Sequence, residues 1–173
     1  MEPGGVSGWL EKMLTLAFIS LAIFLAYVTY ALLKIRCIPA SLSDTYYLLG
    51  NTPLFTVALF AMALTILPSI LSVTPSNWQV VAFLCPAAIG FVGAAPQFKG
   101  VDSAVHKISA LVSAACGILW ALLLSGSWWT VPASVAIAAG LAYLTKTLKG
   151  SKVWWLEMVA FMSVYSSLII ALL

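Results

Sequence analysis

Charged side chains are scarce in this chain. Asp, Glu, Lys and Arg make up 8% of its 173 residues, against roughly a quarter in an ordinary soluble domain. Histidine occurs once, and the three cysteines, Cys37, Cys85 and Cys116, are odd in number and have no close pairing. We therefore expect no disulfide framework, no metal site and no cofactor. The sequence is not that of a soluble catalytic domain.

Hydrophobic residues take the place of the missing charge and make up 63% of the chain. A helix needs roughly 20 apolar residues to cross a hydrocarbon core of about 30 Å, and in lipid the backbone must satisfy its own hydrogen bonds, which favours helices. The sequence therefore predicts an all-α, polytopic membrane helix bundle that forms one transmembrane domain of six transmembrane helices. These are expected at residues 13–33, 53–73, 80–95, 108–125, 131–145 and 153–173.

Two of the six runs are short for a membrane span. Residues 80–95 and 131–145 are either broken helices of the kind that transporters use or helices that flanking residues such as Gln79 and Thr147 extend. We favour extension. Residues 1–12 are expected to be an interfacial tail.

The cations indicate an orientation. The segments at 74–79 and 126–130 carry no charge, whereas seven of the eight Lys and Arg residues fall in the first, third and fifth connections: Lys34, Arg36, Lys99, Lys107, Lys146, Lys149 and Lys152. Because basic residues are enriched on the cytoplasmic side, both termini are predicted on the non-cytoplasmic side of a cell membrane, the inner membrane of a bacterium. Membrane topology thereby explains the net positive charge, which does not indicate nucleic-acid binding. The expected partners are membrane lipids, a second copy of the chain or another membrane protein.

Small residues recur at four-residue steps in the middle of the chain. Ser109, Ser113 and Gly117 form one such stripe, and Ala136 with Gly140 forms another. Such stripes let helix backbones approach closely, so we expect spans three to five to pack together. The bulkier spans one, two and six are expected to face lipid more.

The first connection holds a polar cluster, Ser41, Ser43 and Asp44. Ser41 or Ser43 could cap a short surface helix, with Asp44 in its first turn. Alternatively, these side chains could form one wall of a polar pocket.

Asp102 and His106 form a second candidate site, one helical turn apart at the start of span four. One histidine and one aspartate cannot complete a zinc site. A histidine general base oriented by a carboxylate is one interpretation. A helix cap beside an interfacial imidazole is the other.

Glu157 is the third candidate, because it lies five residues past Lys152 inside an apolar run. A carboxylate at that depth should face the bundle and find a partner. We predict that spans four and six are neighbours and that His106 and Glu157 come within hydrogen-bond reach.

These residues carry two resemblances. Serine, aspartate and histidine near one membrane face resemble the alkaline ceramidase and adiponectin-receptor-like membrane hydrolases, with Ser41 or Ser43, Asp44 or Asp102, and His106 as the matching residues. That superfamily has seven helices and a three-histidine zinc site, so the resemblance implies lipid hydrolysis but not its metal. The segments PASLSDTYYLLG and FVGAAPQFKG resemble those of small bacterial multi-pass membrane proteins, which implies no activity.

Three functions follow from this sequence. The first is a structural, assembly or interaction subunit, which predicts a closed, dry bundle. The second is a small transporter or channel with a polar site on the cytoplasmic side, which predicts a water-lined cavity. The third is a membrane-embedded lipid hydrolase, which predicts a pocket where His106, Asp102 and Glu157 converge.

Overall fold

The apolar runs form helices in the part of the chain that the structure describes. The computed structural model describes residues 4–50, 52–94, 102–147 and 151–173, and no strand occurs among them. Five helices are long and apolar enough to cross a membrane, and α6 is a shorter apolar helix. The elements are α1 (Gly4–Ile35), α2 (Asp44–Leu49), α3 (Thr52–Ser72), the 3-10 turn η1 (Ser76–Trp78), α4 (Gln79–Ala94), α5 (Asp102–Leu123), α6 (Thr130–Leu144) and α7 (Lys152–Leu172).

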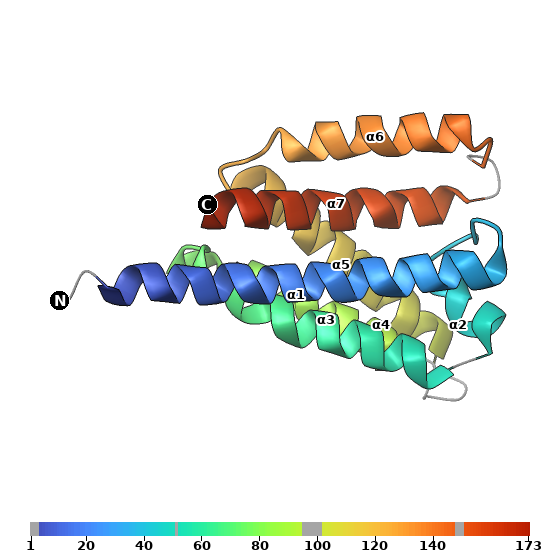
Figure 1. The fold of residues 1–173 in the computed structure, drawn as a ribbon, viewed down its shortest axis with the longest axis horizontal. Coiled ribbons are helices and arrows are strands. Elements are labelled where there is room, and N and C mark those ends of the chain that lie inside the picture. The colour runs from blue at the N-terminus through green and yellow to red at the C-terminus, as the bar shows by residue number, and fades with distance from the viewer. Residues whose placement is uncertain (1–3, 51, 95–101, 148–150) are drawn as a thin grey trace.

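The long helices run up and down, so the chain has two distinct ends (Figure 1). The last turn of α1, helix α2 and the first turns of α5 and α7 lie at one end, called here the α2 end. The turn η1, the connection between α5 and α6, and the C-terminus lie at the opposite end. The described cations of the first, third and fifth connections therefore share the α2 end: Lys34, Arg36, Lys107, Lys146 and Lys152.

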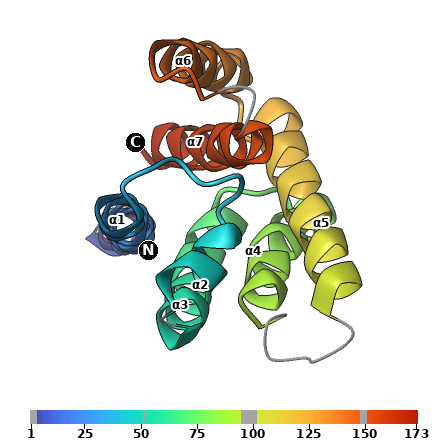
Figure 2. The same cartoon turned by 90° about the vertical axis from the view of Figure 1, so that its right-hand side faces the viewer.

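Five helices form a ring, and one lies outside it. Contacts link α1 to α3, α3 to α4, α4 to α5, α5 to α7, and α7 back to α1. Helix α6 packs mainly on the outer side of α7 (Figure 2). The predicted proximity of spans four and six is confirmed by the contact between α5 and α7.

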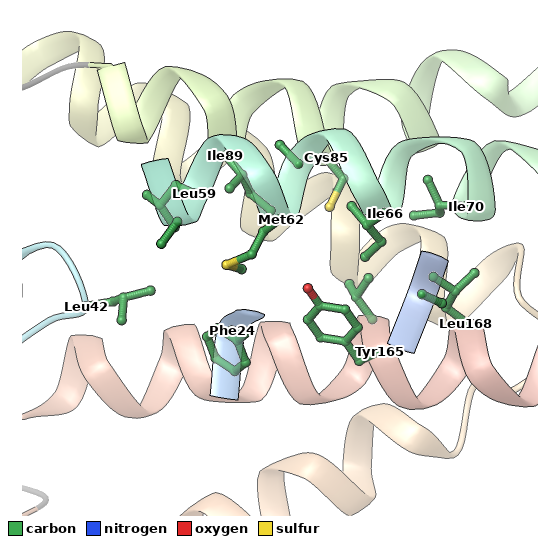
Figure 3. Packing of buried hydrophobic residues seen from close by; sticks show 14 of the residues in the cluster. Phe24, Leu42, Leu59, Met62, Ile66, Ile70, Cys85, Ile89, Tyr165 and Leu168 are labelled. Carbon is green, nitrogen blue, oxygen red and sulfur yellow. The ribbon is translucent and has the colours of Figure 1, made fainter. Parts of the chain in front are cut away.

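The hydrophobic core fills the ring with bulky side chains (Figure 3). They include Phe24 from α1, Met62 from α3, Ile89 from α4, and Tyr165 and Leu168 from α7. In the most apolar 18-residue stretch of each helix, 44% of the residues are buried in α3 and in α7, but only 17% are buried in α5. The expectation that spans two and six face lipid more than spans three to five is therefore wrong. Large side chains fill the centre of the ring, whereas α5 buries mainly small residues together with Trp120 and leaves many of its other apolar side chains exposed.

The small residues of α5 do pack as expected. A Cβ added at Gly117 would lie 2.9 Å from Val164 Cγ2 and 3.1 Å from Cys85 Sγ. Ser113 Oγ donates a hydrogen bond to the Cys85 carbonyl at 3.0 Å. Helix α5 is thus wedged closely between α4 and α7.

The stripe expected in α6 lies on the wrong face. Ala136 and Gly140 are exposed, and nothing lies within 4 Å of a Cβ placed at Gly140. The buried stripe is Ser134, Ala138 and Ala142. Because small and apolar residues occur on every side of α6, the sequence does not show which face of this helix is buried.

The helix ends differ from expectation in two places and agree with it in one. Helix α1 begins at Gly4, so much of the expected tail is helical. Helix α4 begins at Gln79 directly after η1, which confirms extension of span three to a run of 19 residues, Ser76–Ala94. Helix α6 ends at Leu144 and does not reach Thr147, so its 15 residues span only about 22 Å.

Candidate functional site

The connection between α1 and α2 is tied to the start of α7. This segment, residues 36–43, is called here the strap, and it crosses the α2 end of the bundle (Figure 2). Trp154 N donates to the Ala40 carbonyl at 2.9 Å, and Ser151 Oγ donates to the Ile38 carbonyl at 3.2 Å. The first N–H groups of a helix have no partner inside it. The strap therefore takes the place that a capping side chain would otherwise have at α7.

Glu157 makes the third tie between α7 and the strap. Leu42 N donates to Glu157 Oε2 at 2.6 Å, which is short for an N–H to oxygen hydrogen bond. A backbone N–H is thus one partner of this carboxylate, and the prediction from the sequence had considered only a side chain, that of His106. A hydrogen bond between His106 and Glu157 stays a prediction.

Ser41 and Asp44 cap the start of α2 reciprocally. Asp44 N donates to Ser41 Oγ at 3.2 Å, and Ser41 N donates to Asp44 Oδ2 at 3.1 Å. Ser43 Oγ lies 2.9 Å from Ser41 Oγ and shares a hydrogen bond with it. The two bonds have the reciprocal pattern of a capping box, and they support Ser41 as the capping residue. Ser43, which directly precedes α2, makes no side-chain cap bond. The same bonds fix the Asp44 carboxylate in place.

A cleft of about 830 Å³ lies between α5, α7 and the strap. That volume falls within the range of roughly 300–1,000 Å³ typical of small-molecule sites. Its polar lining gathers toward the α2 end and comprises Ser41, Ser43, Asp44, His106, Lys107 and Glu157.

The rest of the cleft is apolar and opens on the flank of the bundle. From α5 the lining continues at four-residue steps after His106, through Ala110, Ala114 and Ile118. At the outer lips, Leu111 of α5 and Leu156 of α7 are 71% and 67% exposed. The cleft is therefore reached from the surface that a bilayer would cover.

The cleft adjoins a smaller cavity inside the ring. This cavity of about 70 Å³ is bounded by α3, α4, α5 and α7, and it shares five lining residues with the cleft: Ser43, Phe55, Ala110, Ala114 and Glu157. Ala110 and Ala114, one turn apart on α5, are called here the portal, because both line the cleft as well as the cavity and have short side chains.

The inner cavity is mostly apolar, and the Tyr165 hydroxyl in its wall is already paired. The Tyr165 hydroxyl lies 2.7 Å from Ser20 Oγ, which also donates to the Met62 carbonyl at 3.0 Å. Among the described residues, no buried side-chain nitrogen or oxygen lacks a hydrogen-bond partner. The cavity therefore suits a hydrocarbon chain better than an ion.

Most of the candidate residues predicted from the sequence meet at this cleft. Ser41, Ser43, Asp44, His106 and Glu157 all line it. Asp102 opens α5, and the predicted orienting or capping role of its side chain lies outside the described residues. Within the described residues, no group of three or more His, Cys, Asp or Glu side chains is placed to hold a metal ion.

Sequence reasoning missed the portal and the strap. The portal had a signal, since Ala110 and Ala114 follow His106 at four-residue steps and so share its helix face. The strap had none, because it acts through backbone groups.

Comparison with protein-family models, with curated proteins and with solved structures gives no match. The class of the protein therefore rests on its own features. The described residues form a helical bundle with five candidate membrane-spanning helices and a cleft that opens on the flank and is polar toward the α2 end.

Proposed function

We propose that the chain is a multi-pass protein of a bacterial inner membrane, with six spans and both termini outside. The alternating helix directions and the gathering of cations at the α2 end support this topology. Helix α6 counts as the fifth span, since a short helix is accommodated by local thinning of the bilayer. Trp128 and Trp129, both exposed just before α6, suit an interfacial anchor.

Labelling of single cysteines tests this topology. In a version without the three native cysteines, Ser76→Cys should react with a membrane-impermeant reagent added to intact cells, and Lys146→Cys should react only after lysis. Both positions are exposed, so access differs only by side of the membrane. The reverse pattern would overturn the orientation.

We propose that the protein binds a membrane lipid in the cleft between α5 and α7. The observation that carries this proposal is the amphipathic lining of the cleft, polar at the α2 end and apolar along the flank. A lipid entering sideways from the bilayer would keep its head group level with the helix ends and its chain between the helices. Ionisable residues within membrane spans are costly and usually serve a site.

The lining of the cleft also bears on the structural and transport functions considered above. A subunit with a purely structural role needs no cleft with a polar end, although lipid binding is compatible with an interaction subunit. A transporter for ions needs a polar path through the ring, whereas the inner cavity is walled by side chains such as Leu59, Ile66 and Val164. Lipid binding is the function that the geometry supports best.

The portal provides the test of lipid binding. Ala114→Leu should fill space at the portal, and a steric cost of about 1–3 kcal/mol against a bound lipid chain corresponds to a loss of bound lipid of at least about fivefold. Ala136→Leu makes the same change at an exposed position of α6 and is the matched control. The readout is the number of lipids retained per protein after stepwise delipidation, counted by native mass spectrometry.

The wild-type protein and the Ala136→Leu variant should retain lipid, and Ala114→Leu should lose it while keeping its thermal stability in detergent. Equal retention by all three proteins, or none by the wild type, would overturn the proposal.

Lipid hydrolysis is the second candidate. One observation favours it, namely that the Ser41 and Ser43 hydroxyls line the same cleft as His106, which could act as a general base. The wild-type protein should then convert phospholipid vesicles into free fatty acid, and His106→Gln should abolish conversion while leaving lipid retention intact. Vesicles left unchanged by the wild-type protein would rule this activity out for the lipids supplied.

A further inference from the structure

The polar end of the cleft has two walls of opposite charge. On one wall, α5 supplies His106 and Lys107. On the other, α2 supplies Asp44 and α7 supplies Glu157. The cleft lies between them, so a head group seated there meets basic groups on one side and carboxylates on the other.

We infer that the cleft selects a phospholipid whose head group is zwitterionic, with its phosphate toward Lys107 and its ammonium toward Asp44 and Glu157. This inference rests on the proposed lipid binding and names the class of ligand. A phosphoethanolamine head group has this pair of charges.

Both carboxylates are held in place before any ligand arrives. Asp44 Oδ2 accepts from Ser41 N, and Glu157 Oε2 accepts from Leu42 N, so the strap orients the two groups from neighbouring backbone positions. The strap N–H groups bind one oxygen of each side chain, and a carboxyl group has two oxygens with several acceptor positions, so room is left for an ammonium group. Groups fixed in advance lose little entropy on binding.

Charge also disfavours the other common class of bilayer phospholipid. An anionic head group without an amine would place its phosphate near Lys107 but leave Asp44 and Glu157 facing a second negative group or none. Juxtaposed like charges cost binding energy and act mainly on selectivity. The two carboxylates thus reject anionic lipid more than they strengthen binding of any one ligand.

A competition experiment tests the inference. The purified full chain is placed in nanodiscs that contain equal amounts of phosphatidylethanolamine and phosphatidylglycerol, and the retained lipids are identified by native mass spectrometry. The wild-type protein should retain the first over the second by at least about tenfold, since like-charge contact at the carboxylates is avoided.

Two variants test which side chains produce the preference for the zwitterionic lipid. Glu157→Gln removes the charge but keeps an oxygen that can accept from Leu42 N, and Lys107→Gln removes the cation at an exposed position. Each should reduce the preference severalfold with lipid still retained. The matched controls are Glu11→Gln and Lys34→Gln, exposed charges outside the cleft, which should leave the preference unchanged.

Each outcome has a distinct meaning. Equal retention of both lipids by the wild type, or preference for the anionic one, would overturn the inference while leaving lipid binding in place. An unchanged preference in both cleft variants would overturn the role of these side chains. No retained lipid in any sample would overturn lipid binding itself.

Discussion

The two ends of the bundle are held together by different chemical groups. At the opposite end, neutral side chains tie the helices together: Trp120 Nε1 donates to Thr74 Oγ1 at 2.7 Å, and the hydroxyls of Thr130 and Ser167 lie 2.5 Å apart. At the α2 end, carboxylates of Asp44 and Glu157 bind the backbone of the strap.

The difference indicates where function resides. Neutral pairs close the opposite end with buried side chains, as packing alone requires. Charged groups in a membrane protein are expensive, and here they surround the polar end of a cleft of about 830 Å³. We therefore expect stability to depend chiefly on the opposite end and the ring, and the proposed ligand binding to depend on the α2 end.

The largest expected effect comes from breaking the opposite end. Trp120 is fully buried, and Trp120→Ala should lower the free energy of unfolding by about 3–5 kcal/mol. Trp128→Ala, at a residue 63% exposed, is the control and should cost far less. Thermal unfolding in detergent measures both. Lipid retained per folded molecule should not change, and a selective loss of lipid by Trp120→Ala would erase the division between the ends.

The next effect comes from the tie between α7 and the strap. Glu157→Ala should leave the Leu42 N–H without its acceptor and cost about 1.5–3 kcal/mol, whereas Glu157→Gln should cost less because an acceptor remains. Amide exchange of the strap, measured by hydrogen–deuterium exchange, should rise in the alanine variant and exceed that in the glutamine variant. Equal exchange in the two variants would mean that the bond does not hold the strap.

A smaller loss of stability is expected from changes to the packing of α5 between the two ends of the bundle. Gly117→Leu forces side-chain atoms against Val164 and Cys85, and overpacking should cost about 1–3 kcal/mol. Gly140→Leu, where nothing lies within 4 Å of the added Cβ, should be neutral or slightly stabilising, since leucine favours helix more than glycine does. Similar melting temperatures for both variants would contradict the wedged position of α5.

The smallest effect is expected at the cap of α2. Ser41→Ala removes the Oγ that accepts from Asp44 N and should cost about 0.5–2 kcal/mol. Ser76→Ala, at an exposed serine with no side-chain cap bond at the opposite end, is the control. Circular dichroism during thermal unfolding compares them. A larger loss in Ser76→Ala would mean that the cap contributes nothing.

Much of the bundle could be predicted because lipid imposes simple rules on sequence. Apolar runs located the helices, and Ser41 with Asp44 had the spacing of a capping box. The position of α7 between the core of the ring and α6 could not be predicted. A helix that is apolar all round has no amphipathic stripe to mark its buried face, so bulky residues such as Leu168 suggested lipid exposure where the structure buries them.

The residues of the candidate site could be predicted from the sequence, but their surroundings could not. His106 and Glu157 stood out because ionisable groups are rare in apolar helices. Their setting was hidden, since the acceptor role of Glu157 depends on a backbone N–H 115 residues away. Backbone donors are present at almost every position and leave no mark in the sequence.

The most direct test of the account is to map where a photoreactive phospholipid attaches. A phosphatidylethanolamine with a diazirine in its acyl chain, activated in native membranes, should label residues of α5 and α7 that line the cleft, with labelling centred near the portal at Ala110 and Ala114. Ala114→Leu should remove most of that labelling. Labels spread evenly over all exposed helix faces, including α6, and unchanged in Ala114→Leu would contradict a lipid site between α5 and α7.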